Sequence, residues 1–209
     1  MRKSVVALLL VALMLLSSSC SVPIIGDFVQ SDESLGKTNN TAVTIASAMQ
    51  DYLKKKDKQD LSLYGVDLVL NSDGNGNVKL FYAKGKPHDL KYDDIYVAEV
   101  DSTTGHVERF SKAKFSKDAL APYELVRNCK AMDAGALPID SEKAISLAVK
   151  LFASNPDFHY DYVQIRLSMP NSVEIYSISF ISMLNDVVYE ATVDAVNGAV
   201  LGSSSRALE

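Results

Sequence analysis

The chain is poor in the residues that most often carry enzyme chemistry. Its 209 residues include only three histidines and two cysteines. It contains no G-x-S-x-G nucleophile motif, no phosphate-binding loop and no H-E-x-x-H pair. We therefore expect no enzymatic activity, no catalytic residue and no cofactor.

A basic excess is also lacking. The chain has 21 Lys and Arg against 26 Asp and Glu, a formal net charge of −5. Proteins that bind nucleic acid normally carry a basic surface that neutralises phosphates. We therefore expect no nucleic-acid partner.

The first twenty residues have the pattern of an export signal. Arg2 and Lys3 precede an uncharged apolar run from Val5 to Leu16, which is shorter than the roughly 20 apolar residues of a membrane-spanning helix. The run ends in "LLSSSC", which resembles a bacterial lipoprotein signal, although Ser17 stands where that family usually has Leu. The alternative is an ordinary secretory signal that leaves Cys20 a free thiol.

The resemblance implies that Cys20 carries lipid, palmitate included, and anchors the chain on the extracytoplasmic side of a bacterial envelope. In a Gram-negative cell this membrane would be the outer one. If Cys20 is acylated, Cys129 has no partner for an intrachain disulfide. We interpret Cys129 as a small buried hydrophobic residue.

One sequence element occurs twice, at residues 94–109 and 187–202, in a shared Y-x-A-x-V-D-x-x-x-G-x-V frame. Alternation of Tyr, Ala and Val directs one strand face toward a core. Asp101 and Asp194 are expected to accept hydrogen bonds from turn amides. Gly105 and Gly198 fall where the turn needs a left-handed residue. The element is therefore interpreted as scaffold rather than as a paired-carboxylate site of Glu190 and Asp194.

An amphipathic helix precedes each copy. The first has Asn40 or Thr41 as its expected N-cap, and the second Asp140 or Ser141. The apolar stripe of the first helix is Ala42, Ile45, Ala46, Met49 and Leu53, and that of the second is Ala144, Ile145, Ala148, Leu151 and Phe152. About four strands follow each helix, with turns at "NSDGNGN", Pro170-Asn171 and Asn185-Asp186. The last strand is expected to end near Leu201, and residues 202–209 to form a frayed tail.

These patterns predict an α+β fold of two tandem modules, each one helix packed on a mostly antiparallel sheet of about four strands, as in cystatin-like folds. The predicted organisation is a signal peptide at 1–20, a tether at 21–40, a first module at 41–115, a connector with a short helix from about 122 to 132 at 116–138, and a second module at 139–209.

The second module resembles the PepSY domain. The resemblance covers residues 139–202 and rests on Ala144, Ile145, Ala148, Tyr189, Val193, Asp194, Gly198 and Val200. Residues 41–110 look like a more divergent copy, whose helix lacks the Ala-Ile start. PepSY domains occur in protease propeptides and in envelope lipoproteins, so the resemblance implies a partner in the envelope, such as a peptidase. It supplies no catalytic residues.

Several functions remain open. The first is a membrane-anchored protein that binds another envelope protein. The second is a carrier of a small molecule or metal, for which Asp157, His159 and Asp161 would share one strand face. Because a zinc site usually has three or four ligands that include Cys or more His, we expect no metal there. The third is a purely structural lipoprotein.

Overall fold

The chain folds around a single large antiparallel sheet. The structure is a computed structural model that describes residues 41–58, 60–71, 73–85, 94–113 and 120–208. The elements are α2 (Ala42–Lys55), β1 (Leu61–Asn71), β2 (Gly76–Lys84), β3 (Ile95–Asp101), β4 (Val107–Lys112), α3 (Leu120–Asn128), the 3₁₀ turn η4 (Ala134–Ala136), α4 (Ser141–Phe152), β5 (Tyr162–Ser168), β6 (Ile175–Ser182), β7 (Val187–Asp194) and β8 (Val200–Ala207). A helix followed by four strands thus occurs twice along the chain.

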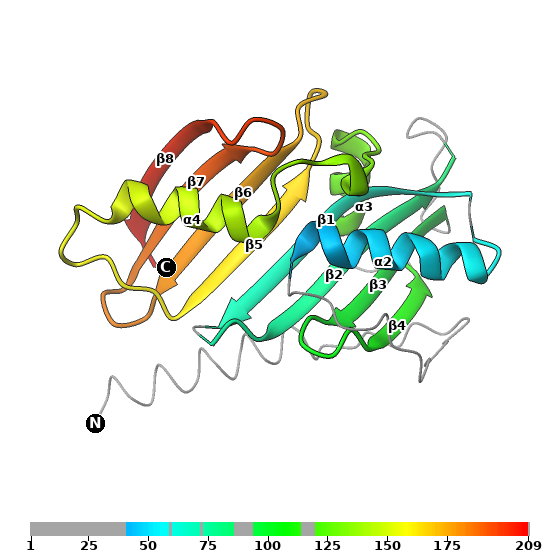
Figure 1. Ribbon diagram of the computed structural model, residues 1–209, viewed down its shortest axis with the longest axis horizontal. Helices are drawn as coiled ribbons and strands as arrows, with labels where there is room; N and C mark the ends of the chain where they lie inside the picture. The colour runs from blue at the N-terminus through cyan, green and yellow to red at the C-terminus, as the bar shows by residue number, and fades with distance from the viewer. Residues whose placement is uncertain (1–40, 59, 72, 86–93, 114–119, 209) are drawn as a thin grey trace.

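The eight strands belong to one sheet in the order β4-β3-β2-β1-β5-β6-β7-β8. The prediction of two tandem modules, each with its own sheet of about four strands, is wrong. β1 pairs antiparallel with β5, from Gly65 opposite Ser168 to Asn71 opposite Tyr162, and so joins the two halves edge to edge (Figure 1). An unpaired edge exposes a row of backbone N–H and C=O groups. The β1–β5 pairing satisfies these groups on β1 and on β5, which are the first strands of the two halves.

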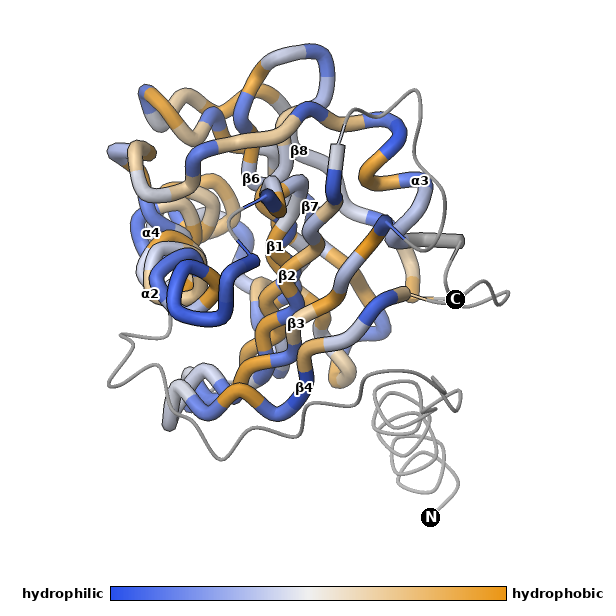
Figure 2. Tube along the Cα trace, turned by 90° about the vertical axis from the view of Figure 1, so that its right-hand side faces the viewer, coloured by the Kyte–Doolittle hydropathy of each residue, from blue (hydrophilic) through white to orange (hydrophobic). Residues whose placement is uncertain are grey.

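Helices α2 and α4 cover one face of this sheet, and Figure 2 shows both on the same side of the strands, opposite α3. A single apolar core lies between this helix layer and the sheet. Its largest fully buried side chains include Tyr82, Tyr176, Phe180, Met49 and Leu68. Since the core contains residues of both halves, burial as well as strand pairing unites them.

The predicted helix stripes are largely confirmed. All five stripe residues of α2 are buried. In α4, Ala144 and Ala148 are fully buried, while Ile145 and Phe152 pack against the core from partly buried positions. Leu151 is 38% exposed, so its place in the stripe was predicted wrongly.

The N-termini of the two covering helices meet at Asp140 and Ser141. Asp140 is the N-cap of α4 and accepts the Ser141 amide at 2.6 Å. The same carboxylate oxygen accepts the Val43 amide of α2 at 3.1 Å, and the Ser141 hydroxyl accepts the Ala42 amide at 2.9 Å. Thr41 occupies the N-cap position of α2 but makes no capping bond with its own side chain. Asp140 and Ser141, which belong to the second half of the chain, therefore cap the N-terminus of α2 in the first half.

Helix α3 packs on the opposite face, against β1 and β2. Leu125 contacts the sheet where Gly65 has no side chain, since a Cβ at that glycine would lie 2.5 Å from Leu125 Cδ2. The helix ends at Asn128, earlier than the predicted 132. Cys129 and Met132 instead form isolated β-bridges with Pro170 and Leu63, and strand pairing of this kind is incompatible with helical backbone.

The repeated turn has the geometry expected from its sequence in both copies. Asp101 Oδ1 accepts the amides of Thr103 and Thr104 at 2.8 and 2.7 Å. Asp194 Oδ1 accepts those of Val196 and Asn197 at 2.8 and 3.0 Å. Gly105 and Gly198 have φ values of 68° and 75°, and each donates its amide to the carbonyl of the Asp four residues earlier. The turn roles predicted for Asp101, Gly105, Asp194 and Gly198 are confirmed by these contacts.

The C-terminal tail was predicted wrongly. Residues 200–207 form β8, which pairs with β7 from Val193 opposite Val200 to Val187 opposite Ala207. The "GSSSR" stretch has no apolar alternation because every residue of β8 is exposed. β8 is a strand because its backbone pairs with β7. Since backbone pairing does not depend on buried side chains, it leaves no hydrophobic pattern in the sequence.

Candidate binding face

The half of the sheet formed by β5 to β8 presents a polar face away from the helix layer. Strand alternation places its side chains there because their neighbours on each strand point into the core. We define the open face by nine exposed or half-buried residues: Gln164, Arg166, Ser177, Ser179, Glu190, Thr192, Gly202, Ser204 and Arg206. Hydroxyl groups and small residues predominate on β6, β7 and β8.

A single cross-strand row extends from the first half of the sheet onto this face. The strand registers place its members directly opposite one another in the order Arg109, Glu99, Lys79, Asp67, Arg166, Ser177, Thr192, Gly202. Charges alternate in sign over the first five positions, and small residues follow. Nζ of Lys79 lies 3.7 Å from Glu99 Oε1, and Arg166 binds Asp67 at 2.6 and 2.7 Å. The charged part of the row is thus compensated within the chain, whereas the hydroxyl part presents donors and acceptors outward.

A shallow depression of about 340 Å³ lies over β6, β7 and β8. From the open face it is lined by Ser177, Ser179, Glu190, Thr192, Gly202 and Ser204. Gly202 adds to this space, because nothing lies within 4 Å of the position that a Cβ there would take. Hydroxyl groups beside a carboxylate suit a polar partner that offers several hydrogen-bonding groups.

Glu190 is held in a fixed position on this face. Its Oε1 accepts a hydrogen bond from Nε of Arg206 at 3.2 Å, and its Oε2 accepts the Ser204 hydroxyl at 3.3 Å. All three side chains come from β7 and β8. Asp194, the other carboxylate of the repeated element, binds turn amides instead. The two carboxylates therefore do not form a paired site.

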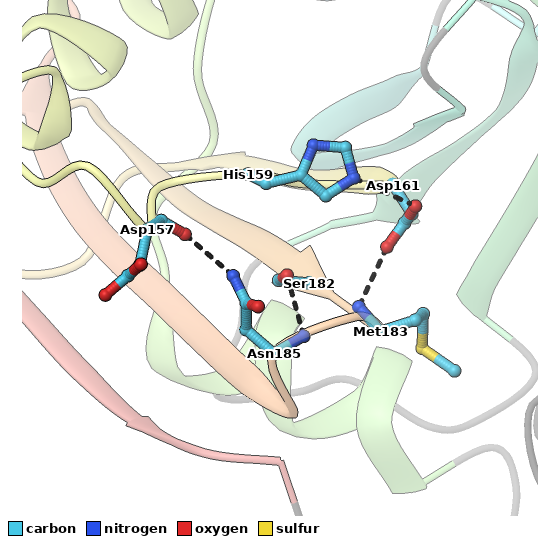
Figure 3. A network of polar contacts seen from close by, with 6 residues as sticks. All are labelled: Asp157, His159, Asp161, Ser182, Met183 and Asn185. Atoms are coloured by element: carbon cyan, nitrogen blue, oxygen red, sulfur yellow. Dashed lines mark hydrogen bonds and ion pairs between the residues drawn. The ribbon is translucent and has the colours of Figure 1, made fainter. Parts of the chain in front are cut away.

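Asp157, His159 and Asp161, the alternative metal ligands, do not converge on one point (Figure 3). His159 Nε2 lies 3.4 Å from Asp161 Oδ1. The second oxygen of Asp161 accepts the Met183 amide at 2.8 Å, and the carboxylate of Asp157 points away from the other two residues. Within the described ranges, no group of three or more His, Cys, Asp or Glu side chains could hold a metal ion.

The polar contacts around these residues join two loops. The Asn185 side chain donates to the carbonyl oxygen of Asp157 at 2.7 Å, and the Asn185 amide donates to the Ser182 hydroxyl at 3.4 Å (Figure 3). The bonds from Asn185 to Asp157 and from the Met183 amide to Asp161 join the segment before β5 to the turn between β6 and β7, whereas the bond to Ser182 lies within that turn. Asp157, Asp161 and Asn185 therefore have a structural role, because they hold these two segments together.

Cys129 is buried, with an exposed fraction of 8%, and it is a free thiol. Its predicted role as a small hydrophobic residue is confirmed by its contacts with Phe81 and Leu125. Burial raises the pKa of this thiol, and its hydrogen bonds with Ser168 and Met169 oppose that effect only in part. Cys20, the predicted lipidation site, lies outside the described residues.

Comparisons with known proteins give little beyond this geometry. No protein-family model matches the chain, and no curated protein matches it. A crystal structure of a candidate lipoprotein from Clostridium difficile 630 is similar at 12% identity with a TM-score of 0.48, over 87% of this chain and 100% of that one. A likeness of that size is too weak to assign a fold or a function. The PepSY resemblance therefore stays a prediction.

In the part of the chain that the structure describes, no helix is long and apolar enough to cross a membrane.

The open face was not predicted from the sequence. Five of its nine residues are Ser, Thr or Gly, and the relation of all nine to one another comes only from the strand register. The sequence signal that could have indicated this face is the alternation of polar and apolar residues in "SISFIS" and "YEATVD".

Proposed function

We propose that this protein is an envelope lipoprotein, anchored through Cys20, that binds another extracytoplasmic protein with its open face and has no catalytic role. The observation that carries this proposal is the open face: half of a large sheet turns hydroxyl, amide and charged side chains outward while its other side is filled by the core. A non-obligate protein interface is about as polar as the rest of a protein surface and contains bridging waters, so a polar face of this kind is compatible with partner binding.

The anchor is supported by the "LLSSSC" signal and Cys20. A peptidase is the partner class that the PepSY resemblance favours. The absence from the sequence of any nucleophile–base motif supports a binding role rather than catalysis.

The anchor and the partner are tested separately. Cys20→Ser should move the full chain from the membrane fraction to the soluble fraction of the envelope. A Cys20→Ser chain that remains fully membrane-bound would contradict lipid anchoring.

The partner is tested with a matched pair of variants in crosslinked envelope extracts. Thr192→Arg places a long cation in the depression, whereas Ser146→Arg places the same side chain on an exposed position of α4. A partner that is recovered with the Ser146→Arg chain and lost with the Thr192→Arg chain would support the proposal. Equal recovery with both variants would place the interface elsewhere, and recovery of no partner would favour a structural role.

The depression also favours a second candidate, a carrier of a small polar ligand. A ligand that binds the native chain raises its melting temperature. The expected signature is a rise in the parent chain and in the Ser146→Arg chain that is absent in the Thr192→Arg chain. A flat response of the parent across envelope metabolites would remove this candidate.

A further inference from the structure

The two edges of the sheet differ in how they are protected against pairing with another strand. Natural edge strands usually carry charges, proline or bulges for this purpose. A bulge interrupts the pairing of each edge strand with its neighbour, but β4 also carries the charged residues Glu108, Arg109 and Lys112. β8 contains no lysine and no proline, and its one charged residue, Arg206, is bound to Glu190 of its own sheet. Beyond the bulge at its start, β8 is therefore a regular edge from Gly202 to Ala207 with one charged residue and no proline.

The backbone of β8 shows which groups face outward. The Leu208 amide donates to the Asp186 carbonyl at 2.8 Å, across the β7–β8 pair. Since backbone groups alternate in direction along a strand, those of Ser204 and Arg206 also point toward β7. The amides and carbonyls of Ser203 and Ser205 consequently point away from β7, on a side where no other described strand pairs with β8.

We propose that β8 pairs antiparallel with β8 of a second copy of this chain, with Ser204 of each copy on the two-fold axis. This register places Ser203 opposite the outward-facing Ser205 of the other copy, so that their amides and carbonyls bind each other. Gly202 then lies opposite Arg206, and the space beside Gly202 accommodates that long side chain. No like charges face each other, which would be unfavourable across a strand pair.

The symmetry of this pair suits two chains anchored in one membrane. Residues opposite each other in an antiparallel pair point to the same face, so the two-fold axis runs through the sheet, perpendicular to it. Both helix layers then lie on one side of the joined sheet, and so do both copies of Thr41, the first residue that the structure describes. The two open faces lie together on the other side and could bind two partner sites at once, which increases avidity.

A single pair of eight-residue strands buries less than the roughly 1,200 Å² of a stable interface. Pairing is therefore expected mainly where the anchor concentrates the chains at a surface, because tethering raises effective concentration. In this respect the inference rests on the proposed function. The experiment is accordingly performed on the full chain in isolated envelopes, with a thiol-oxidising catalyst and non-reducing electrophoresis.

Ser204→Cys places two thiols on the axis. Residues in such a non-hydrogen-bonded pair have Cα atoms about 4.5 Å apart, within the range of a disulfide, so we expect about tenfold more covalent dimer than from Glu108→Cys on the β4 edge. Gly202→Cys and Arg206→Cys should each give little dimer alone, because each is roughly 13 Å from its own copy along the strand. Chains carrying one or the other, expressed together, should form the disulfide.

A proline substitution tests the proposed backbone pairing independently of the cysteine variants. Ser205→Pro removes an amide that points away from β7, and so it should leave the fold and melting temperature unchanged while it suppresses the Ser204→Cys dimer. Proline is tolerated at such positions of edge strands.

The inference is overturned if Ser204→Cys gives no more dimer than Glu108→Cys, if Gly202→Cys alone links as well, or if Ser204→Cys links to a chain of another mass. Failure of the anchor is distinguishable, because the chain would then leave the membrane fraction.

Discussion

Arg166 and Asp67 lie opposite each other across the β1–β5 junction and are joined by two parallel hydrogen bonds. Nε of Arg166 donates to Asp67 Oδ1 at 2.7 Å, and Nη2 donates to Oδ2 at 2.6 Å. The two residues are 99 positions apart in the chain. This two-point geometry is the strongest arrangement for an arginine and a carboxylate, and it joins the two halves of the sheet in the register observed.

A double-mutant cycle with Asp67→Ala and Arg166→Ala should therefore show a measurable coupling. The side chains are 25% and 47% exposed, so screening by water limits the expected coupling to about 0.5–1 kcal/mol. Urea unfolding of the four chains measures it. The control cycle uses Lys84 and Asp60, a more exposed pair within the first half. A junction coupling no larger than that of the control would contradict a special role for the pair.

Asp140 should be the most important capping residue of the chain, because one carboxylate accepts amides from two helices. Loss of an N-cap side chain destabilises a protein by about 0.5–2 kcal/mol, and the negative charge also favours both positive helix ends. We expect Asp140→Ala to lower the free energy of unfolding by about 2 kcal/mol, near the upper end of that range.

Asp133→Ala is the matched control, because Asp133 caps only the short η4 turn through the Gly135 amide. Asp140→Asn should fall between the two, since an amide oxygen still accepts hydrogen bonds but has no charge. If Asp140→Ala is no more destabilising than Asp133→Ala, the shared cap does not stabilise the fold.

The elements that could be predicted from the sequence are those with a local cause. The α2 stripe follows from helical spacing, and Asp194 with Gly198 follows from turn chemistry. The junction of β1 with β5 has no local cause, because an apolar strand such as "LSLYGVDLVL" is suited to a neighbour on either side. Only the complete sheet determines which edge it uses. For the same reason the sequence suggested two sheets where the chain forms one.

The open face and β8 were missed for a related reason. The polar residues of the open face alternate with buried ones, as they do in any strand with one buried face, so the pattern does not mark a binding face. β8 has no buried side chain and leaves no periodic signal, and its "GSSSR" stretch has the composition of a flexible tail. Pairing of Glu190 with Arg206 joins two residues that have no recognisable spacing. The candidate metal residues, by contrast, had a strand-like spacing, but the loop before β5 turns Asp157 away from His159.

Gly198 should not tolerate a side chain. Its φ of 75° is left-handed, and a Cβ would lie 3.2 Å from Leu147 Cδ1 and 3.6 Å from Ile139 Cδ1. Gly198→Ala should destabilise the chain by about 1–2 kcal/mol, since both the backbone and the space are unfavourable. Gly202→Ala is the control, because that glycine has open space around it, and it should change the free energy of unfolding by less than about 0.5 kcal/mol. Equal effects in thermal unfolding would show that the turn does not require glycine.

Cys129 should be unreactive in the folded chain. Burial raises the pKa of its thiol, and the thiolate is the form that reacts with alkylating reagents. In a Cys20→Ser chain, which has no other thiol, iodoacetamide at pH 8 should modify native Cys129 at least about tenfold more slowly than the urea-unfolded chain. Similar rates in the two states would mean that the thiol is accessible in the native fold.

The same pKa shift predicts a pH dependence of stability. A thiol whose pKa is higher in the folded state holds its proton more tightly there, so the folded state binds more protons than the unfolded state above about pH 8.5. Its stabilising contribution is complete below that pH and is lost as the pH rises through the folded-state pKa. Cys129→Ala should therefore lose less stability than its parent between pH 7 and pH 10 in urea unfolding. The buried Tyr82 and Tyr176, whose pKa values are also raised by burial, are common to both chains and cancel in the comparison. An identical alkaline loss in the two chains would mean that the Cys129 thiol has the same pKa in the folded and unfolded states.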